Sequence, residues 1–237
     1  MTRHSISIDG PTASGKSTLA TGLAERLGLA FLDTGLTYRA VGYAVSLDPR
    51  QPLRGRLGSA LQHHPVVYDN AGKVTQKHTI VLEGREITEE LWDPSLESYL
   101  KTVARDAAWR KEILRLHQRI VDECGDIVVV GRDVAMTLLP AADLNVYLTA
   151  GLAVRRERRR AQYRDRRDRS IAVGPPTGLD IENRAAVRTL PRSLELDSTY
   201  LPVPAVLTCV LRRLGHPLVS ANGCAVLAGS LIKDRTP

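Results

Sequence analysis

Aromatic residues and long apolar runs are scarce in this 237-residue chain. Phe, Trp and Tyr together make up 4% of the residues, so few side chains are present on which nucleic-acid bases could stack. No apolar run approaches the roughly 20 residues that a membrane-spanning helix needs. The opening residues, MTRHSISIDG, lack the apolar core of a signal peptide. We therefore expect a cytoplasmic protein with no membrane partner.

Cysteine is also rare. Cys124, Cys209 and Cys224 are odd in number and form no Cys-x-x-Cys pair. This pattern argues against a disulfide framework and a zinc site, and it suits a reducing compartment. A chain of this length can bury roughly 70–75% of its unfolded surface, so it needs no cross-links. The length suits one domain, with or without a small insert.

Positive charge, in contrast, is abundant, and arginine supplies most of it. The net charge is +7, and nine of the fifteen residues in 155–169 are arginine. Such a run is typical of nucleic-acid binding, and equally of a pocket for polyanionic small molecules. Glu157, Asp165 and Asp168 interrupt the run, which together with the scarcity of aromatic residues argues against nucleic acid.

The first part of the chain alternates strand-like and helix-like segments. Residues 4–10 alternate apolar and polar side chains, and 16–28 carry leucines at helical spacing. A second apolar run over 29–35 precedes a helical pattern over 37–47. This order predicts an α/β fold with a parallel sheet flanked by helices.

The rest of the chain continues in the same manner. We predict an antiparallel β insert over about 65–88 and helical structure over about 95–123. Further predicted elements are buried strands at 126–133 and 142–150, a loop beginning at 175, a last strand at 193–199 and a closing helix at 203–215.

A glycine-rich segment, GPTASGKST, lies between the first predicted strand and helix. It matches Gly-x-x-x-x-Gly-Lys-[Ser/Thr] in the strand–loop–helix context that this motif requires. The glycines let backbone N–H groups turn toward a phosphate, and the helix N-terminus adds a partial positive charge. We expect ATP to bind at Gly10, Pro11, Thr12, Ala13, Ser14, Gly15, Lys16, Ser17 and Thr18.

Two side chains of this loop carry the chemistry. Lys16 can reach the β and γ phosphates, and the Ser17 hydroxyl is the expected ligand of a Mg²⁺ ion bound with ATP. The chain contains no Asn-Lys-x-Asp guanine signature. Its length favours a small-molecule kinase over a GTPase, a motor or a helicase.

Six segments follow one another along the chain: IDGPTASGKST, FLDTGLTYRAV, VVVGRDV, LPAADLNVYLTA, RDRRDRS and LELDST. Together they resemble the bacterial cytidylate kinase family, over about residues 6–214. The resemblance implies transfer of the γ-phosphate of ATP to CMP or dCMP with Mg²⁺. It also implies a P-loop kinase domain over 1–214, with a monophosphate-binding insert at about 60–95 and a short arginine-rich lid at about 155–172. The tail 215–237 has no assigned role.

Transfer between two phosphates brings two polyanions together, and arginine side chains can neutralise their charge. Arg39 follows a strand-end loop, and Arg132 follows a buried strand, at the edge where ligands bind in open α/β sheets. The resemblance implies that both contact the CMP phosphate. It also implies that Arg155, Arg158 and Arg159 face the ATP phosphates from the lid.

The resemblance also assigns the nucleoside side of the site. It implies that Thr34 and Tyr38 line the site, that Asp133 accepts from the cytosine amino group, that Arg110 and the residue at position 101 read the base, and that Arg164 and Asp168 hold the ribose hydroxyls. Three of the candidate residues have simpler alternatives. Tyr38 can simply pack, and Arg110 can be a solvated helix residue. Asp33 either supports Mg²⁺ through water or only caps the following helix.

The chain departs from the family on the base and lid sides. Lys101 replaces a small hydroxyl residue, Ile171 replaces an arginine, and 135–137 reads Ala-Met-Thr in place of the usual small residues. The lid is shortened between Gln162 and Tyr163, and an extra stretch covers about 177–189. Two alternatives stay open. The altered base-side residues favour a kinase for a modified pyrimidine nucleotide or another small metabolite. The arginine run at 155–169 motivates an RNA-binding or regulatory protein on a degenerate kinase domain. We take a monomer as the working expectation.

Overall fold

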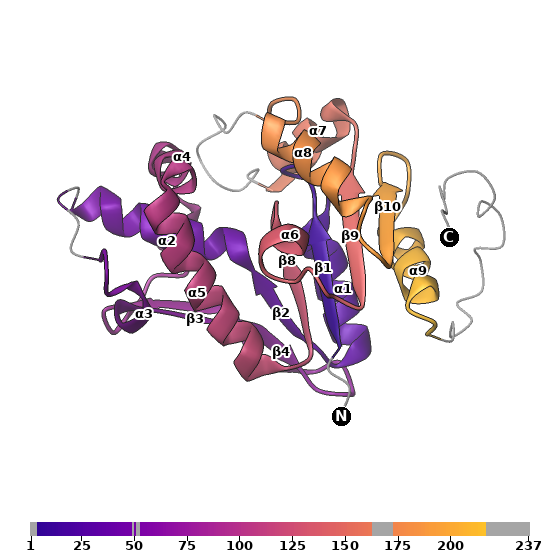
Figure 1. Cartoon of the computed structure of the whole chain (residues 1–237), viewed down its shortest axis with the longest axis horizontal. Coiled ribbons are helices and arrows are strands. Elements are labelled where there is room, and N and C mark those ends of the chain that lie inside the picture. Colours follow the sequence, from indigo (N-terminus) through magenta and orange to yellow (C-terminus); the bar gives the residue numbers. More distant parts are fainter. Residues whose placement is uncertain (1–3, 49, 51–52, 163–172, 217–237) are drawn as a thin grey trace. The chain divides into compact units, whose positions relative to one another are not determined.

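The structure is a computed structural model that describes residues 4–48, 50, 53–162 and 173–216 (Figure 1). The chain divides into two compact units. One unit comprises residues 24–127, and the other joins the N-terminal segment up to Leu23 with the chain from Val128 onward. The glycine-rich loop belongs to the second of these, which we call the loop unit.

Strands of the loop unit form a sheet in the order β10-β9-β1-β8 (Figure 1). Strand β9 pairs in parallel with both of its neighbours, β1 and β10. The side chains of Ile8, Val129 and Val146 are fully buried, as expected for apolar strands covered on both faces. The strand bounds are β1 (Ser5–Asp9), β8 (Ile127–Val130), β9 (Leu144–Thr149) and β10 (Ser193–Asp197).

Two helices of this unit, the first and the last, were predicted from the sequence, and three others were not. They are α1 (Lys16–Leu27), which begins in this unit, α6 (Val134–Thr137), α7 (Leu152–Gln162), α8 (Gly178–Val187) and α9 (Val203–Arg213). The sequence predicted only a loop beginning at 175, so α8 was missed. A capping box starts it: Thr177 Oγ accepts from Asp180 N at 3.3 Å, and the Asp180 carboxylate accepts from Thr177 N at 2.7 Å.

Residues 24–127 form a mainly helical unit with short strands. Strand β2 (Ala30–Asp33) leads into α2 (Thr34–Leu47), and α3 (Leu57–Ala60) is a single turn. Two 3₁₀ turns, η1 (Glu90–Trp92) and η2 (Pro94–Leu96), precede α4 (Glu97–Arg105) and α5 (Ala107–Cys124). Asp106 separates these two helices, because its carboxylate accepts from the N–H groups of Ala108 and Trp109 and so caps α5.

The β insert is more complex than the single hairpin that the sequence predicted. Strands β4 (Val66–Tyr68) and β5 (Val74–Gln76) do form an antiparallel hairpin, and β4 continues the sheet from β2. Strands β3 (Leu61–His64), β6 (Thr79–Leu82) and β7 (Arg85–Glu86) form a separate antiparallel sheet. Segments distant in sequence pair in this second sheet, which local patterning does not reveal.

The predicted α/β class, with a largely parallel sheet and flanking helices, is confirmed. Across the described residues, no helix combines the length and the apolar character needed to cross a membrane.

Candidate functional site

The glycine-rich loop has the backbone conformation that its motif predicts. Gly10 has φ +146°, and a Cβ atom there would lie 2.0 Å from the carbonyl oxygen of Leu148. Only glycine fits that position without moving strand β9. Ala13 and Gly15 also have positive φ values, of 62° and 100°, so the backbone turns sharply before α1 begins.

Lys16 and Ser17 lie in the first turn of α1. The Lys16 ammonium is half-buried and donates to the carbonyl oxygen of Pro11 at 2.9 Å. This bond ties the ammonium to the backbone of the second residue of the loop. Ser17 and Thr18 are exposed. The N-terminus of α1 adds its partial positive charge at the same place, which favours an anion.

Two arginines of α7 support the loop through its backbone. Arg155 is only 2% exposed and donates to the carbonyl oxygens of Ala150, Thr12 and Gly174 at 3.0, 3.2 and 3.2 Å. Arg158 donates to the carbonyl oxygen of Ser14 at 3.2 Å and to Ser198 at 2.8 and 2.9 Å. Their positive charge therefore lies against the loop. Direct contact with ATP phosphates stays a prediction for both.

Arg159 is the third arginine that the sequence placed on the ATP side. It is 9% exposed and donates to the side-chain oxygen of Gln162, in the last turn of α7, at 3.0 Å. Arg164 and Asp168, predicted for the ribose, and Ile171 lie outside the described residues.

Arg132 and Asp133 follow strand β8 directly. Arg132 is exposed, and its guanidinium donates to the Thr12 hydroxyl of the phosphate loop. Its backbone carbonyl accepts from the side-chain amide of Asn183 in α8. Asp133 is half-buried and directly precedes α6. The predicted acceptor-phosphate arginine therefore lies beside the phosphate loop.

Asp9 is a polar residue of this region that the sequence reasoning missed. It is fully buried, and its two carboxylate oxygens accept from the N–H groups of Val134 at 2.9 Å and Ala135 at 2.8 Å. Burial raises the pKa of Asp9 to about 6, although these two hydrogen bonds act in the opposite direction. The feature of the sequence that could have revealed Asp9 is its place at the end of a predicted buried strand, where a carboxylate needs a hydrogen-bond or charge partner.

Other predicted site residues lie on α2 or directly before it, in the unit of residues 24–127. Asp33 caps this helix, because its side chain accepts from Gly35 N at 3.0 Å. Its capping role is confirmed, whereas a role toward Mg²⁺ stays a prediction. Thr34 is 7% exposed and is the first residue of the helix. Tyr38 is half-buried, with its ring 6.5 Å from that of His117, so it does pack.

Arg39, the arginine of α2, is anchored by several contacts. It is 8% exposed, donates to the carbonyl oxygen of Leu91 at 3.2 Å, and pairs with Glu97 at 3.7 Å. Its guanidinium also lies 5.7 Å from the centre of the Trp92 ring. Contact with the CMP phosphate stays a prediction for it.

The two predicted base-reading residues lie on the neighbouring helices. Lys101 on α4 is exposed and pairs with Glu97 at 3.9 Å, one helical turn away. Arg110 on α5 is half-buried, so it is not a fully solvated helix residue. Glu97 is shared between Lys101 and Arg39, which links the predicted base-reading lysine to the predicted phosphate-binding arginine.

Comparison with known proteins decides the family. A family model described as cytidylate kinase matches residues 6–172. The chain belongs to the cytidylate kinase family. A cytidylate kinase from Chloroflexus aggregans is 37% identical over 165 residues, covering 69% of this chain and 71% of that protein. One from Thermotoga neapolitana is 33% identical over 218 residues, covering 87% of this chain and 94% of that protein.

This family membership implies a divalent metal ion bound with ATP, and the oxygen donors of the chain fit such an ion. Magnesium prefers oxygen ligands and usually keeps several waters and substrate phosphates in its shell. The exposed Ser17 hydroxyl, beside a phosphate-binding loop, can supply one such ligand. Among the residues that the structure describes, no group of three or more His, Cys, Asp or Glu side chains could hold a metal by itself. These donors suit an ion that arrives with the nucleotide.

A chain of three histidines in the unit of residues 24–127, of which His63 and His117 are buried and His78 is half-buried, was not predicted from this cytidylate kinase sequence. The Thr37 hydroxyl lies 2.6 Å from His63 Nδ1 and 2.7 Å from His117 Nε2. The His63 and His78 rings stack 4.7 Å apart, with their Nε2 atoms in contact. Burial lowers the pKa of His117 to about 3 and that of His63 well below its usual value, so both rings are neutral.

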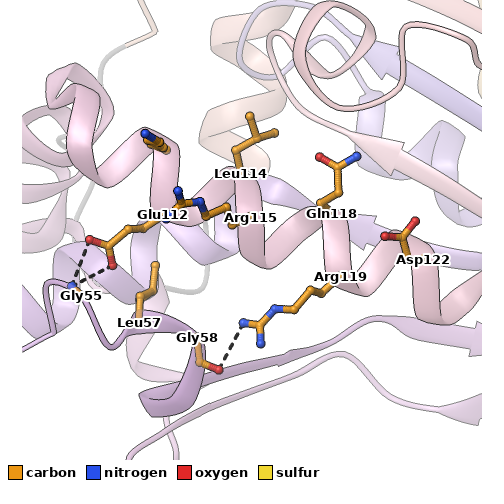
Figure 2. Close-up of a pocket in the computed structure, with 10 residues that line it drawn as sticks. Gly55, Leu57, Gly58, Glu112, Leu114, Arg115, Gln118, Arg119 and Asp122 are labelled. Atoms are coloured by element: carbon orange, nitrogen blue, oxygen red, sulfur yellow. Dashed lines mark hydrogen bonds between the residues drawn. The ribbon is translucent and has the colours of Figure 1, made fainter.

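A separate hollow of about 710 Å³ lies between α3 and α5 (Figure 2). Both Glu112 carboxylate oxygens accept from Gly55 N at 3.1 Å, and Arg119 donates to the Gly58 carbonyl oxygen at 3.2 Å. Of the predicted site residues that the structure describes, none lines it. The described residues that line this hollow are therefore different from those predicted to contact the nucleotides.

Proposed function

We propose that this member of the cytidylate kinase family transfers the γ-phosphoryl group of ATP to CMP or dCMP, with Mg²⁺ accompanying ATP. The observation that carries the proposal is the complete phosphate loop, with the Lys16 ammonium held inside it and Arg132 beside it. The family match over residues 6–172 supports the choice of acceptor.

The chemistry needs little from the protein beyond position and charge. A phosphate oxygen of CMP attacks the γ-phosphorus of ATP, a new P–O bond forms, and the bond to the β-phosphate oxygen breaks. The products are CDP and ADP. The N–H groups of the loop and the N-terminus of α1 hold the phosphates, and the Lys16 ammonium stabilises charge that moves from the γ to the β phosphate.

Arginine supplies the charge on the acceptor side. Arg132 extends its guanidinium to Thr12 of the loop, which brings a bidentate phosphate ligand close to the ATP site. Arg39 is pre-oriented by Leu91, Glu97 and Trp92, so it needs little ordering to bind a phosphate. Asp133 provides an acceptor for the cytosine amino group.

The metal is assigned to Ser17, with Asp33 as a support through water. When bound, Mg²⁺ neutralises charge shared between the β and γ phosphates. The Asp33 carboxylate would have to serve this role while one of its oxygens accepts from Gly35 N.

The test is a coupled assay of ADP release with CMP, dCMP, UMP and AMP as acceptors. We expect a cytosine nucleotide to lead, with kcat/KM for CMP exceeding that for UMP at least about tenfold, because uracil leaves the Asp133 carboxylate without a donor. Chromatographic detection of CDP confirms true transfer. If neither CMP nor dCMP is phosphorylated, the acceptor is another metabolite and the proposal is wrong.

A further inference from the structure

Arg132 is held from three directions, all within the loop unit. Its guanidinium donates to the Thr12 hydroxyl, and its carbonyl accepts from the Asn183 amide. The third support is indirect: Val134 N and Ala135 N, which follow it by two and three residues, both donate to Asp9. The exposed Arg132 side chain is thus attached to a backbone segment that these hydrogen bonds hold in place.

Asp9 connects this backbone to the phosphate loop. It is the last residue of β1 and directly precedes Gly10, the first residue of the loop. The preceding residue also contributes, since the Ile8 carbonyl accepts from Gly131 N at 3.1 Å. Adjacent residues of β1 therefore hold the segment 131–135 at both of its ends.

A carboxylate is chemically well matched to this task. The short helix α6 begins with N–H groups that have no partner inside the helix, and the two oxygens of Asp9 accept from two of them. An asparagine of the same shape offers only one oxygen and would point its NH₂ group at an N–H donor. Burying a carboxylate without an ion pair is unfavourable for stability, which argues that Asp9 serves geometry.

We propose that Asp9 is a positioning residue: its carboxylate fixes the segment 131–135 to the base of the phosphate loop and so sets where Arg132 meets the acceptor phosphate. The inference rests on the proposed function, because it takes Arg132 as an acceptor-phosphate ligand.

Protonation of Asp9 would weaken this attachment. Its pKa of about 6 means that the carboxylate form, which accepts from both N–H groups, predominates above that pH and is lost as the pH falls through it. The charged groups facing it are Lys16, which lowers its pKa, and Asp133, which raises it. The Tyr147 hydroxyl of β9 also interacts with Asp9, and burial raises the pKa of Tyr147 to about 12, so it stays neutral.

The primary experiment compares steady-state kinetics of the parent and Asp9→Asn at pH 7.5. We expect kcat/KM for CMP to fall about tenfold or more, which corresponds to loss of one charge-assisted hydrogen bond. KM for ATP should change much less, because the loop itself keeps its glycines and Lys16. An equal loss toward both substrates, or no loss, overturns the positioning role.

The pH dependence supplies a readout that a merely structural residue would not move. CMP itself has a phosphate pKa near 6, but that contributes equally to both proteins. We therefore plot the ratio of kcat/KM for CMP in Asp9→Asn to that in the parent. The ratio should rise toward 1 as the pH falls below about 6, since the parent then loses its own carboxylate. A ratio that stays constant with pH contradicts the proposal.

A matched control is available at the other end of β1. The Asp143 carboxylate accepts from Ser5 N at 3.0 Å and from Arg192 at 3.2 Å, so Asp143→Asn makes the same chemical change at another carboxylate of the unit that accepts through both oxygens. This variant should leave the CMP kinetics and their pH profile unchanged. If Asp9→Asn does not fold, Asn183→Ala removes the amide that holds the Arg132 carbonyl and should raise KM for CMP.

A second measurement is independent of the acceptor. Amide hydrogen exchange over residues 131–135 should be at least about tenfold faster in Asp9→Asn than in the parent, because exchange reports local opening. Asp143→Asn should show no change there. Unaltered exchange in Asp9→Asn overturns the proposal even if CMP is not the acceptor. Faster exchange with no phosphorylation of CMP or dCMP would instead refute the proposed function alone.

Discussion

Lys16 carries a positive charge inside the phosphate loop. The contribution of this charge to kcat can be measured by substitution. Lys16→Ala removes the ammonium and its bond to Pro11 while keeping the loop glycines. We expect kcat to fall on the order of a hundredfold or more, since one electrostatic donor at such a site contributes ~3–4 kcal/mol to transition-state binding. Lys73→Ala, at an exposed position, is the control. A folded Lys16→Ala protein with unchanged kcat would remove the loop from the mechanism.

Lys101 is predicted to influence the choice of base rather than the stability of the fold. It is exposed, and its pairing with Glu97 at 3.9 Å contributes little to stability. A long ammonium can donate to uracil O4 or O2, which weakens discrimination between the two pyrimidines. Lys101→Ser should therefore increase the ratio of kcat/KM for CMP to that for UMP. Parallel kinetics with both nucleotides measure this ratio, and a decrease would contradict the role of Lys101.

At the scale of elements, α7 supports the phosphate loop through buried arginine. Arg155 donates to three backbone carbonyl oxygens, which its loss would leave without these partners. Arg155→Ala should lower the free energy of unfolding by roughly 2–4 kcal/mol. Arg160→Ala, at an exposed position of the same helix, should change it by less than about 0.5 kcal/mol. Urea denaturation measures both.

Equal stability of these two variants would show that the contacts of Arg155 contribute little to the free energy of unfolding.

Helix α8 is a second supporting element, since its Asn183 amide and the carbonyl of Asp180 form hydrogen bonds with neighbouring elements. Tyr147 of β9 donates to that carbonyl at 2.7 Å. The stretch about 177–189, which the sequence analysis predicted to be additional to the family pattern, thus contains the residue whose amide holds the backbone of Arg132.

For the whole molecule, buried neutral histidines make stability depend on pH. The pKa of His117 in the folded protein, about 3, is far below its unfolded value of about 6.5. The unfolded chain therefore binds a proton first as the pH falls. Stability is complete above about pH 6.5 and decreases below it, by up to about 1.4 kcal/mol per pH unit for each such histidine.

The difference between parent and variant isolates this contribution. His117→Gln keeps a group that can bond to the Thr37 hydroxyl but does not titrate. Between pH 6.5 and 4.5, the free energy of unfolding should fall less steeply in this variant than in the parent. His64→Gln, at an exposed position, should follow the parent. Parallel slopes for His117→Gln and the parent would show that His117 is not held neutral.

Local patterns were sufficient for much of this protein. The spacing of glycines, Lys16 and Ser17 predicted the loop, because its conformation depends on residues adjacent in sequence. Apolar periodicity predicted most strands and helices for the same reason. The capping box at Thr177 was also present in the sequence, but the prediction of a loop from 175 onward did not use it.

The α/β class, the phosphate loop and the resemblance to cytidylate kinases follow from residues that are near one another in the sequence. The hydrogen-bond partners of Asp9, Arg155 and the histidines become known only from the folded chain. Each of these side chains meets partners distant in sequence: Asp9 bonds to Val134 and Ala135, and His117 bonds to Thr37. Burial and hydrogen bonding of such groups depend on which segments fold against one another, and that information is absent from local spacing.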